Sequence, residues 1–318
     1  MRTIAAGLAL ALAAAPALAQ PQDVRQHIAT ARQAAGTDLT PYMQMCRSAD
    51  PAAAPEAPPA AARIAMGRPA PGRAFDNLYF LGNHWTTAWA LTTSEGIIIL
   101  DAMDNDDDAE HSIEAGLRRF GLDPANIRYV IVSHGHWDHY GGANRLKRLY
   151  GARIVMSEPD WRMLETRLEF DSPRAGRPPA RDMVVNGGDR ITLGDTTVEL
   201  LATPGHTMGT LSPMFTVRHN GQEHRAVIWG GTSFNFGRQP ARLQAYIDGS
   251  ARALQVARDQ RADVFLSNHA FNDEAVARTA ALAANPRMAN PFVIGTDGVQ
   301  RAITVLHECA RATMASWR

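Results

Sequence analysis

Cysteine is scarce in this chain of 318 residues, which contains only Cys46 and Cys309. Neither stands in a stretch rich in other metal ligands, so zinc–thiolate chemistry is disfavoured. In an oxidising compartment an even pair often forms one disulfide, here joining the two ends of the chain. In the chain-entropy model such a closure stabilises the fold by on the order of 4–5 kcal/mol. Two separate buried thiols are the alternative, and the sequence leaves both interpretations open.

The chain also has no excess of positive or negative side chains. Lysine and arginine together number 32, as do aspartate and glutamate, and the sequence pI is about 7.2. No basic stripe or block is present, so a nucleic-acid partner held through its phosphates is excluded as the main ligand. No acidic tail indicates a cationic partner. We therefore expect a small-molecule substrate, and we expect the protein to be a monomer.

The N-terminal apolar run is too short to span a membrane. Its sequence, MRTIAAGLALALAAAPALAQ, has a positive residue, an Ala/Leu-rich stretch and the small residues that a signal peptidase reads. It predicts a signal peptide over residues 1–19, cleaved between Ala19 and Gln20, and a periplasmic or secreted protein. No cysteine stands at the cleavage point, so no membrane anchor is expected.

The pattern of apolar segments predicts an α/β protein. After the signal peptide, residues 20–74 form an arm, with a helix followed by an extended Ala/Pro-rich segment, and residues 75–318 form the main domain. Short β-branched and aromatic runs alternate with runs of helical spacing. Strands are predicted at 77–82, 85–93, 96–102, 127–133, 152–157 and 262–267, hairpins at 189–203 and 214–231, and helices at 108–121, 144–151 and 241–259, with two closing helices. Such a mixture implies two packed sheets with helices outside.

Four potential metal ligands occur within six positions in the segment VSHGHWDHYGG. They are His134, His136, Asp138 and His139, and they follow an apolar strand directly. A strand alternates its side chains and a helix brings together residues three and four apart. All four can therefore converge only where a strand turns sharply into a helix. Chance is a poor explanation for this spacing.

Two further histidines follow apolar strands, His206 in ATPGHTMGTLS and His269 in FLSNHAF. Taken alone, each is more simply explained as an ordinary surface or hydrogen-bonded residue. Together with the run they give five histidines and one aspartate, enough for two sites with three protein ligands each. Three ligands with an open position are typical of catalytic zinc. Nitrogen and oxygen donors favour zinc, with manganese and iron as alternatives.

The histidine run, TPGHT, GIIILDA and the late SNH resemble the metallo-β-lactamase superfamily over roughly residues 75–318. The resemblance implies a four-layer αβ/βα sandwich with two Zn²⁺ ions in a cleft between the sheets. It also implies that Asp101 braces the metal-binding loop. The implied ligands are His134, His136 and His206 for one zinc, and Asp138, His139 and His269 for the other.

The composition of one segment differs between the enzyme classes of this superfamily. Most of its lactonases, glyoxalase-type thioesterases and phosphodiesterases bridge the metals with an aspartate after a later strand, whereas AVIWGGTSFNF has no carboxylate. Thr232 stands where another β-lactamase subclass has cysteine. The pattern is closest to subclass 3 of the class B zinc β-lactamases. It departs from that subclass at Gly135 and Trp137, which replace alanines, and at Thr232 and Phe234, which replace serines.

The resemblance therefore implies a secreted enzyme that opens the β-lactam ring of penicillins, cephalosporins and carbapenems with a zinc-bound hydroxide. Asp138 would orient the water and relay its proton. The residues expected to hold the substrate are Thr232, Ser233 and Asn235. Trp85 would either contact the substrate or fill the core. Hydrolysis of a lactone or another ester on the same scaffold is the alternative function, followed by a non-enzymatic zinc-binding protein.

Overall fold

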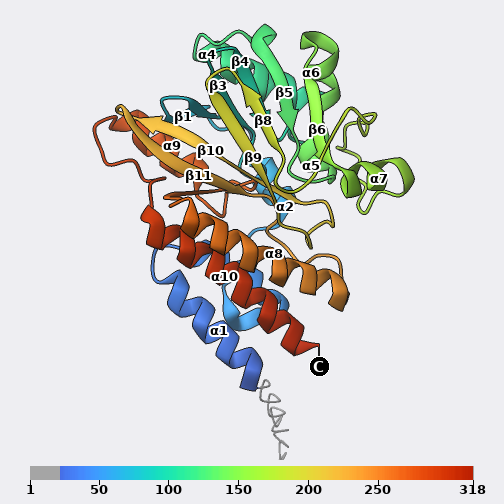
Figure 1. The fold of residues 1–318 in the computed structure, drawn as a ribbon, viewed down its shortest axis with the longest axis vertical. Helices are drawn as coiled ribbons and strands as arrows, with labels where there is room; N and C mark the ends of the chain where they lie inside the picture. Colours follow the sequence, from blue (N-terminus) through green and yellow to red (C-terminus); the bar gives the residue numbers. More distant parts are fainter. Residues whose placement is uncertain (1–21, 318) are drawn as a thin grey trace, which may run out of the picture.

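Two β-sheets packed face to face form the centre of the molecule (Figure 1). The computed structural model describes residues 22–317, so the predicted signal peptide lies outside the described residues. One sheet has the strand order β1 (Gly72–Phe75), β2 (Leu78–Phe80), β3 (Trp89–Thr93), β4 (Gly96–Leu100), β5 (Ile127–Ile131), β6 (Arg153–Ser157) and β7 (Met183–Val185). The other has the order β12 (Val264–Ser267), β11 (Gln222–Trp229), β10 (Leu211–His219), β9 (Thr196–Ala202) and β8 (Arg190–Leu193).

The direction of the strands places several carboxyl ends at one edge. Strands β4 to β7 are parallel, whereas β1 to β4 are antiparallel neighbours. In the other sheet β11 and β12 are parallel, and β9 runs in the same sense as β11 because both pair antiparallel with β10. Strands β4, β6 and β12 of the parallel pairs are almost entirely buried, as is usual when helices cover a sheet, whereas Val184 of β7 at the sheet edge is exposed.

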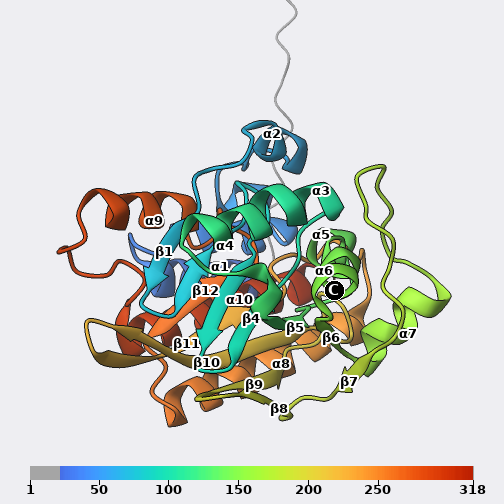
Figure 2. The same cartoon turned by 90° about the horizontal axis from the view of Figure 1, so that it is seen from above.

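Helices cover the outer face of each sheet (Figures 1 and 2). The seven-stranded sheet is covered by α3 (Asp106–Asp108), a π-helical turn (Ala109–Glu114), α4 (Ala115–Arg119), α5 (Trp137–Tyr140), α6 (Ala143–Tyr150) and α7 (Glu158–Thr166), with a 3₁₀ turn (Pro124–Asn126). The five-stranded sheet is covered by α8 (Pro240–Asp259) and α10 (Gly295–Ser316), and α1 (Gln22–Ala35) packs outside α10. Helix α9 (Ala275–Ala284) lies beside β1.

Alternation along the strands builds this layering. Ile98 faces the core between the sheets, whereas its neighbours Ile97 and Ile99 face the helices of the first sheet. In β11, Ile228 faces the same inner core and Val227 faces α8 and α10. Each strand therefore supplies apolar side chains to two layers. The predicted αβ/βα sandwich is confirmed.

The N-terminal arm differs from the predicted extended segment. Residues 40–53 form two 3₁₀ helices (Thr40–Ser48 and Pro51–Ala53), and the Ala/Pro-rich stretch contains the short helix α2 (Ala60–Ala65). The prediction was wrong at α2 because no proline stands between Pro59 and Pro69. Pro59 precedes the first turn of the helix, where a missing N–H costs nothing. Six alanine-rich residues then follow without interruption, and alanine has the highest helix propensity.

The two cysteines are joined. Cys46 and Cys309 form a disulfide between the first 3₁₀ helix and α10, which decides between the two interpretations of the sequence. Between residues 22 and 317 no helix has both the length and the apolar composition required to cross a bilayer.

Candidate metal centre

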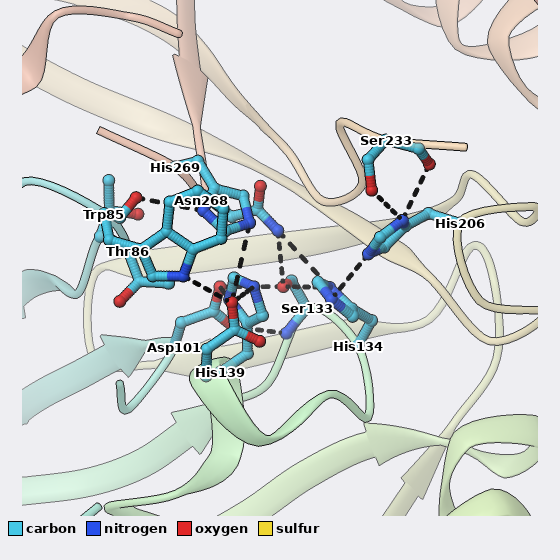
Figure 3. A network of polar contacts seen from close by, with 12 residues as sticks. Trp85, Thr86, Asp101, Ser133, His134, His139, His206, Ser233, Asn268 and His269 are labelled. Atoms are coloured by element: carbon cyan, nitrogen blue, oxygen red, sulfur yellow. Dashed lines mark hydrogen bonds and ion pairs between the residues drawn. The ribbon is translucent and has the colours of Figure 1, made fainter. Parts of the chain in front are cut away.

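The carboxyl ends of four strands meet at one point between the sheets (Figure 3). Asp101 follows β4 and His134 follows β5, both in the seven-stranded sheet. His206 follows β9 and His269 follows β12, both in the five-stranded sheet. A cleft at the carboxyl ends of strands is a common ligand site in α/β proteins.

The predicted passage from strand to helix is present in the histidine run. His134 and His136 lie in the loop after β5, and Asp138 and His139 lie in α5. Gly135 fits this loop because a Cβ there would lie 2.7 Å from the terminal methyl carbon of Met163. That carbon is the end of a flexible side chain, so an alanine at this position would require Met163 to shift.

Three histidines form the first group. Ligand atoms of His134, His136 and His206 all lie within 4.8 Å of one another, and all three residues are buried. The Nε2 atoms of His134 and His206 are 3.1 Å apart. Their ring planes are nearly perpendicular, as are those of His136 and His206. This geometry brings three nitrogen ligands to one point.

Asp138 and His139 belong to the second group. Their ligand atoms lie within 4.8 Å of each other and of His134. The Nε2 atom of His269 is 4.0 Å from the Oδ2 atom of Asp138, and the rings of His269 and His139 are centred 5.1 Å apart. The structure thus brings the six predicted ligands into one contiguous cluster, with His269 at its edge.

Asp101 holds the cluster from the side of β4. One carboxylate oxygen accepts the backbone N–H of Ser133, and the other accepts the Ser133 hydroxyl and lies 2.8 Å from Nδ1 of His139. The Ser133 hydroxyl has given its hydrogen to Asp101, so it accepts from Nδ1 of His134 at 3.1 Å. Asp101 therefore supports one histidine directly and a second one through Ser133.

The backbone at Asp101 is also unusual, with a φ of 62°. Aspartate is among the few residues that tolerate this left-handed conformation. Observed strain of this kind is common at functional sites.

Each histidine of the cluster has one ring nitrogen engaged by a partner outside the cluster. Nδ1 of His206 lies 3.0 Å from the carbonyl oxygen of Ser233, and Nδ1 of His269 lies 3.1 Å from that of Trp85. A carbonyl oxygen only accepts, so both Nδ1 atoms carry hydrogen and both Nε2 atoms have a free lone pair. Such contacts orient metal ligands in known metal sites.

Among the ring nitrogens of the cluster, one is buried without a hydrogen-bond partner. Nε2 of His139 is inaccessible to solvent and makes no hydrogen bond in the described part of the chain. A buried polar atom in that state is costly, and each such case requires an explanation. A bound cation would satisfy it, so the donor set fits a divalent metal such as zinc.

Burial sets the protonation of the histidines. Burial and the neighbouring imidazoles hold the pKa of His134 and of His206 well below the usual value, and burial lowers the pKa of His269 to about 4. At His139 burial acts in the same direction, but the adjacent carboxylates outweigh it and raise the pKa. His134, His206 and His269 are therefore neutral at pH 7, which is the form of imidazole that binds metal.

A pocket of about 180 Å³ opens over the cluster. The predicted substrate-binding residues Thr232, Ser233 and Asn235 line it, opposite Trp85 and Phe271. Trp85 is half-buried, and its indole ring stacks on Phe271. Its placement combines the two roles considered for it, because one side packs on protein and the other lines the pocket. A larger pocket of about 630 Å³ adjoins this one and shares Phe170 and Asn235 with it.

Sequence reasoning missed several residues that hold the cluster. Asp160 of α7 accepts the backbone N–H of Gly135, the hydroxyl of Thr207 and the N–H of Gly209, so it ties the two ligand loops together. Glu169 and Arg242 contact the three-histidine group from loop and helix positions that no motif marks. Asn268 donates to the carbonyl oxygen of Gly230. Only Asn268 had a signal, since it belongs to the SNH motif.

Part of the chain matches a known family model. Residues 85–213, which contain the histidine run and His206, match the family model of the metallo-beta-lactamase superfamily. This match and the two-sheet architecture confirm the resemblance to the superfamily. The match, together with the buried histidine groups, supports a metallo-hydrolase.

The similar solved structures are metallo-beta-lactamases. A subclass B3 metallo-beta-lactamase of Bradyrhizobium japonicum is 26% identical with a TM-score of 0.61, over 74% of this chain and 90% of that chain. A metallo-beta-lactamase from Legionella gormanii has a TM-score of 0.65 over 76% of this chain and 93% of that chain. Its identity of 24% shows the shared fold alone. The resemblance to subclass 3 is thus confirmed.

The curated relatives have a different name. A hydroxyacylglutathione hydrolase of Pseudomonas putida is 36% identical over 83 residues, and one of Brucella anthropi is 32% identical over 126 residues. These matches span 26% and 40% of the respective relatives' length, and the same shares of this chain. Because the matches cover only part of each relative, they do not establish the substrate of this chain.

Proposed function

We propose that this chain is an exported zinc β-lactamase with two zinc ions, held by His134, His136 and His206 and by Asp138, His139 and His269. The observation that carries the proposal is the composition of the segment between β11 and α8. Residues 230–239 contain no aspartate or glutamate, and Thr232, Ser233 and Asn235 face the pocket instead. Most other hydrolases of this fold are expected to bridge the two metals with a carboxylate, and residues 230–239 do not offer one.

Asp138 is the carboxylate placed to handle protons. Burial raises its pKa, but the imidazoles of His139 and His269 outweigh burial and lower it, so Asp138 is ionised at neutral pH. Zinc bound to the cluster would supply an acidified water and polarise a carbonyl oxygen. Asp138 would orient that water, accept its proton and deliver it to the departing amide nitrogen. The Nε1–H of Trp85 donates to Oδ2 of Asp138 at 3.1 Å and fixes the carboxylate in this direction.

The opposite wall would hold the substrate. The hydroxyls of Thr232 and Ser233 and the amide of Asn235 offer donors for the carboxylate that β-lactams carry next to the scissile ring. Phe170 and Phe271 provide apolar surface on either side of the pocket. This combination of apolar walls and a few polar groups is typical of small-molecule sites.

Hydrolysis of an acylglutathione thioester is the second candidate. It rests on the hydroxyacylglutathione hydrolases that share the segment with the histidine run. The composition of residues 230–239 argues against it, because that segment offers no bridging carboxylate. Hydrolysis of a lactone or another ester is a third candidate, and the lack of a bridging carboxylate in residues 230–239 argues against it as well.

The deciding experiment compares substrate classes. Protein lacking residues 1–19 would be stripped with chelator, reloaded with zinc and assayed with a chromogenic cephalosporin, a carbapenem, a lactoyl-glutathione thioester and a lactone. We expect zinc-dependent turnover of the β-lactams. Turnover of the thioester or lactone alone would retain the metal site and refute the β-lactamase proposal. Metal analysis of the reloaded protein should give two zinc ions per chain.

The role of Asp138 has its own test. Asp138→Asn keeps the size of the side chain and removes the charge. We expect a loss of turnover of at least about 10²-fold, the usual contribution of a positioned acid–base group. The zinc content must be measured alongside, because turnover unchanged at equal zinc content would refute the proton relay.

Export is part of the proposal. The features that support it are the signal-like residues 1–19 and the disulfide, since structural disulfides persist in oxidising compartments. Intact mass of the protein recovered from the periplasm or medium should correspond to a chain beginning at Gln20. Recovery of the uncleaved chain from the cytoplasm would contradict it.

A further inference from the structure

Arg242 lies in the first turn of α8 and is buried directly behind the three-histidine group. Its Nε donates to the carbonyl oxygen of Gly205 at 2.6 Å, and its Nη2 donates to the carbonyl oxygen of His206. The guanidinium also lies 4.3 Å from the centre of the Phe236 ring. Arg242 therefore fixes the backbone from which His206 projects.

The same guanidinium binds a carboxylate that reaches a second histidine. Both oxygens of Glu169 accept from Arg242, each at 2.8 Å. Oε2 of Glu169 is also 3.1 Å from Nε2 of His136, and the ring of the adjacent Phe170 packs edge-on against His136 at 4.8 Å. A carboxylate on Nε2 makes that nitrogen a donor, which leaves Nδ1 of His136 as the nitrogen with a lone pair.

From these contacts we propose that Arg242 and Glu169 are positioning residues for the three-histidine site. Arg242 would act on His206 through its backbone and on His136 through Glu169, so one guanidinium sets two of the three ligands. This inference rests on the metal site of the proposed function, but not on the identity of the substrate. The third ligand, His134, is held separately through Ser133 on the far side of the cluster.

The chemistry suits arginine and glutamate specifically. The planar guanidinium forms two parallel hydrogen bonds to a carboxylate and still presents Nε to a carbonyl oxygen, which a lysine ammonium cannot do. A partner that fixes the ring nitrogen of a metal-bound histidine typically changes metal affinity 10–100-fold when removed. A purely structural ion pair, which would only fasten the loop after α7 to α8, has no such effect on metal.

The test is zinc binding by purified, chelator-stripped protein, followed in competition with a chromogenic chelator. Wild type is compared with Glu169→Gln and with Arg242→Lys. We expect one of the two binding steps to weaken about 10–100-fold in both variants, while the step assigned to Asp138, His139 and His269 is unchanged. The visible spectrum of the cobalt-loaded protein should change with it, because the geometry around one metal is altered.

The matched control is Arg174→Gln. Arg174 lies on the same loop as Glu169 and pairs with Asp104 and Asp108, without touching any histidine of the cluster. We expect this variant to lose stability in urea unfolding yet to bind zinc and cobalt as wild type does.

Three results would overturn the inference. If Glu169→Gln and Arg242→Lys shift only the urea midpoint, as the control does, then the pair is structural. Equal weakening of both zinc steps would show a general loosening of the site. If wild type itself binds no zinc, the inference and the proposed function both fail. Zinc binding by wild type without turnover of any β-lactam would refute only the proposed substrate.

Discussion

Trp85 contacts two members of the second ligand group with different parts of the same residue. Its indole N–H donates to Oδ2 of Asp138 at 3.1 Å, and its backbone carbonyl oxygen lies 3.1 Å from Nδ1 of His269. Of these contacts, only the first depends on the side chain. The indole ring also packs on the His269 ring, with the ring centres 4.5 Å apart. A substitution that removes only the bond to Asp138 must therefore keep an aromatic ring at this position.

Trp85→Phe should keep the aromatic packing on Phe271 and lose the hydrogen bond to Asp138. We expect the affinity for the second zinc to fall about 10–100-fold, as for other partners of metal ligands. Competition with a chromogenic chelator measures it. Trp137→Phe is the control, since Trp137 lines the same pocket while the bond to Asp138 comes from Trp85. Equal zinc binding by both variants would show that the indole N–H is dispensable.

Asp101→Asn should damage both stability and metal binding. Asn tolerates the left-handed backbone, so the change acts through hydrogen bonds. Its amide NH₂ cannot accept from Ser133 or His139, which leaves a buried donor unpaired at a cost of about 1–3 kcal/mol. Urea unfolding of the metal-free protein measures this loss. We also expect weaker zinc binding, because His139 loses the partner of its Nδ1. A variant with wild-type zinc affinity would contradict the bracing role.

The raised pKa of Asp104 should make the stability of the protein depend on pH. Burial and the charges of Asp108 and Asp138 raise its pKa from 3.8 to about 7, against the opposing effect of Arg174. Between about pH 4 and 7 the folded protein therefore holds a proton that the unfolded chain releases, so this group's contribution to stability falls as pH rises.

The measurement is the free energy of unfolding of metal-free Asp104→Asn minus that of wild type, from urea titrations at several pH values. We expect this difference to rise with pH across that window, by up to about 1.4 kcal/mol per pH unit. Asp106→Asn is the control, because Asp106 lies two residues away at the start of α3 and its side chain is half-exposed. A difference that is constant with pH would refute the prediction for Asp104.

Removing the disulfide should destabilise the protein without touching the metal cluster. Replacing Cys46 and Cys309 by serine is expected to cost about 2–5 kcal/mol in the free energy of unfolding. Wild type under reducing conditions should match the double variant. Zinc binding at low temperature should be retained, since both cysteines lie among α1, α10 and the first 3₁₀ helix. Unchanged stability would show that packing alone holds the arm.

The sequence was most informative where chemistry is concentrated in a short segment. Four ligands of the cluster come from residues 134–139, and the run of Ile97, Ile98 and Ile99 lies in one of the predicted strands. Glu169 and Arg242 could not be predicted, because a charged residue in an irregular loop or a first helical turn is usually solvated. Their partners come from 33–73 residues away, a distance that no local pattern encodes. Helix α2 was missed for the opposite reason, since prolines nearby outweighed a local propensity that was correct.

The disulfide and the packing of α1 on α10 also have a consequence for the order of folding. A chain is synthesised from its N-terminus, and domains tend to fold as their segments emerge. Cys46 and α1 are made among the first residues, whereas their partners Cys309 and α10 are made among the last. The two sheets and their cleft can assemble before the first helix has anything to pack against. The disulfide can therefore form only after Cys309 has been synthesised. In a chain truncated before α10, helix α1 would lack the helix on which it packs.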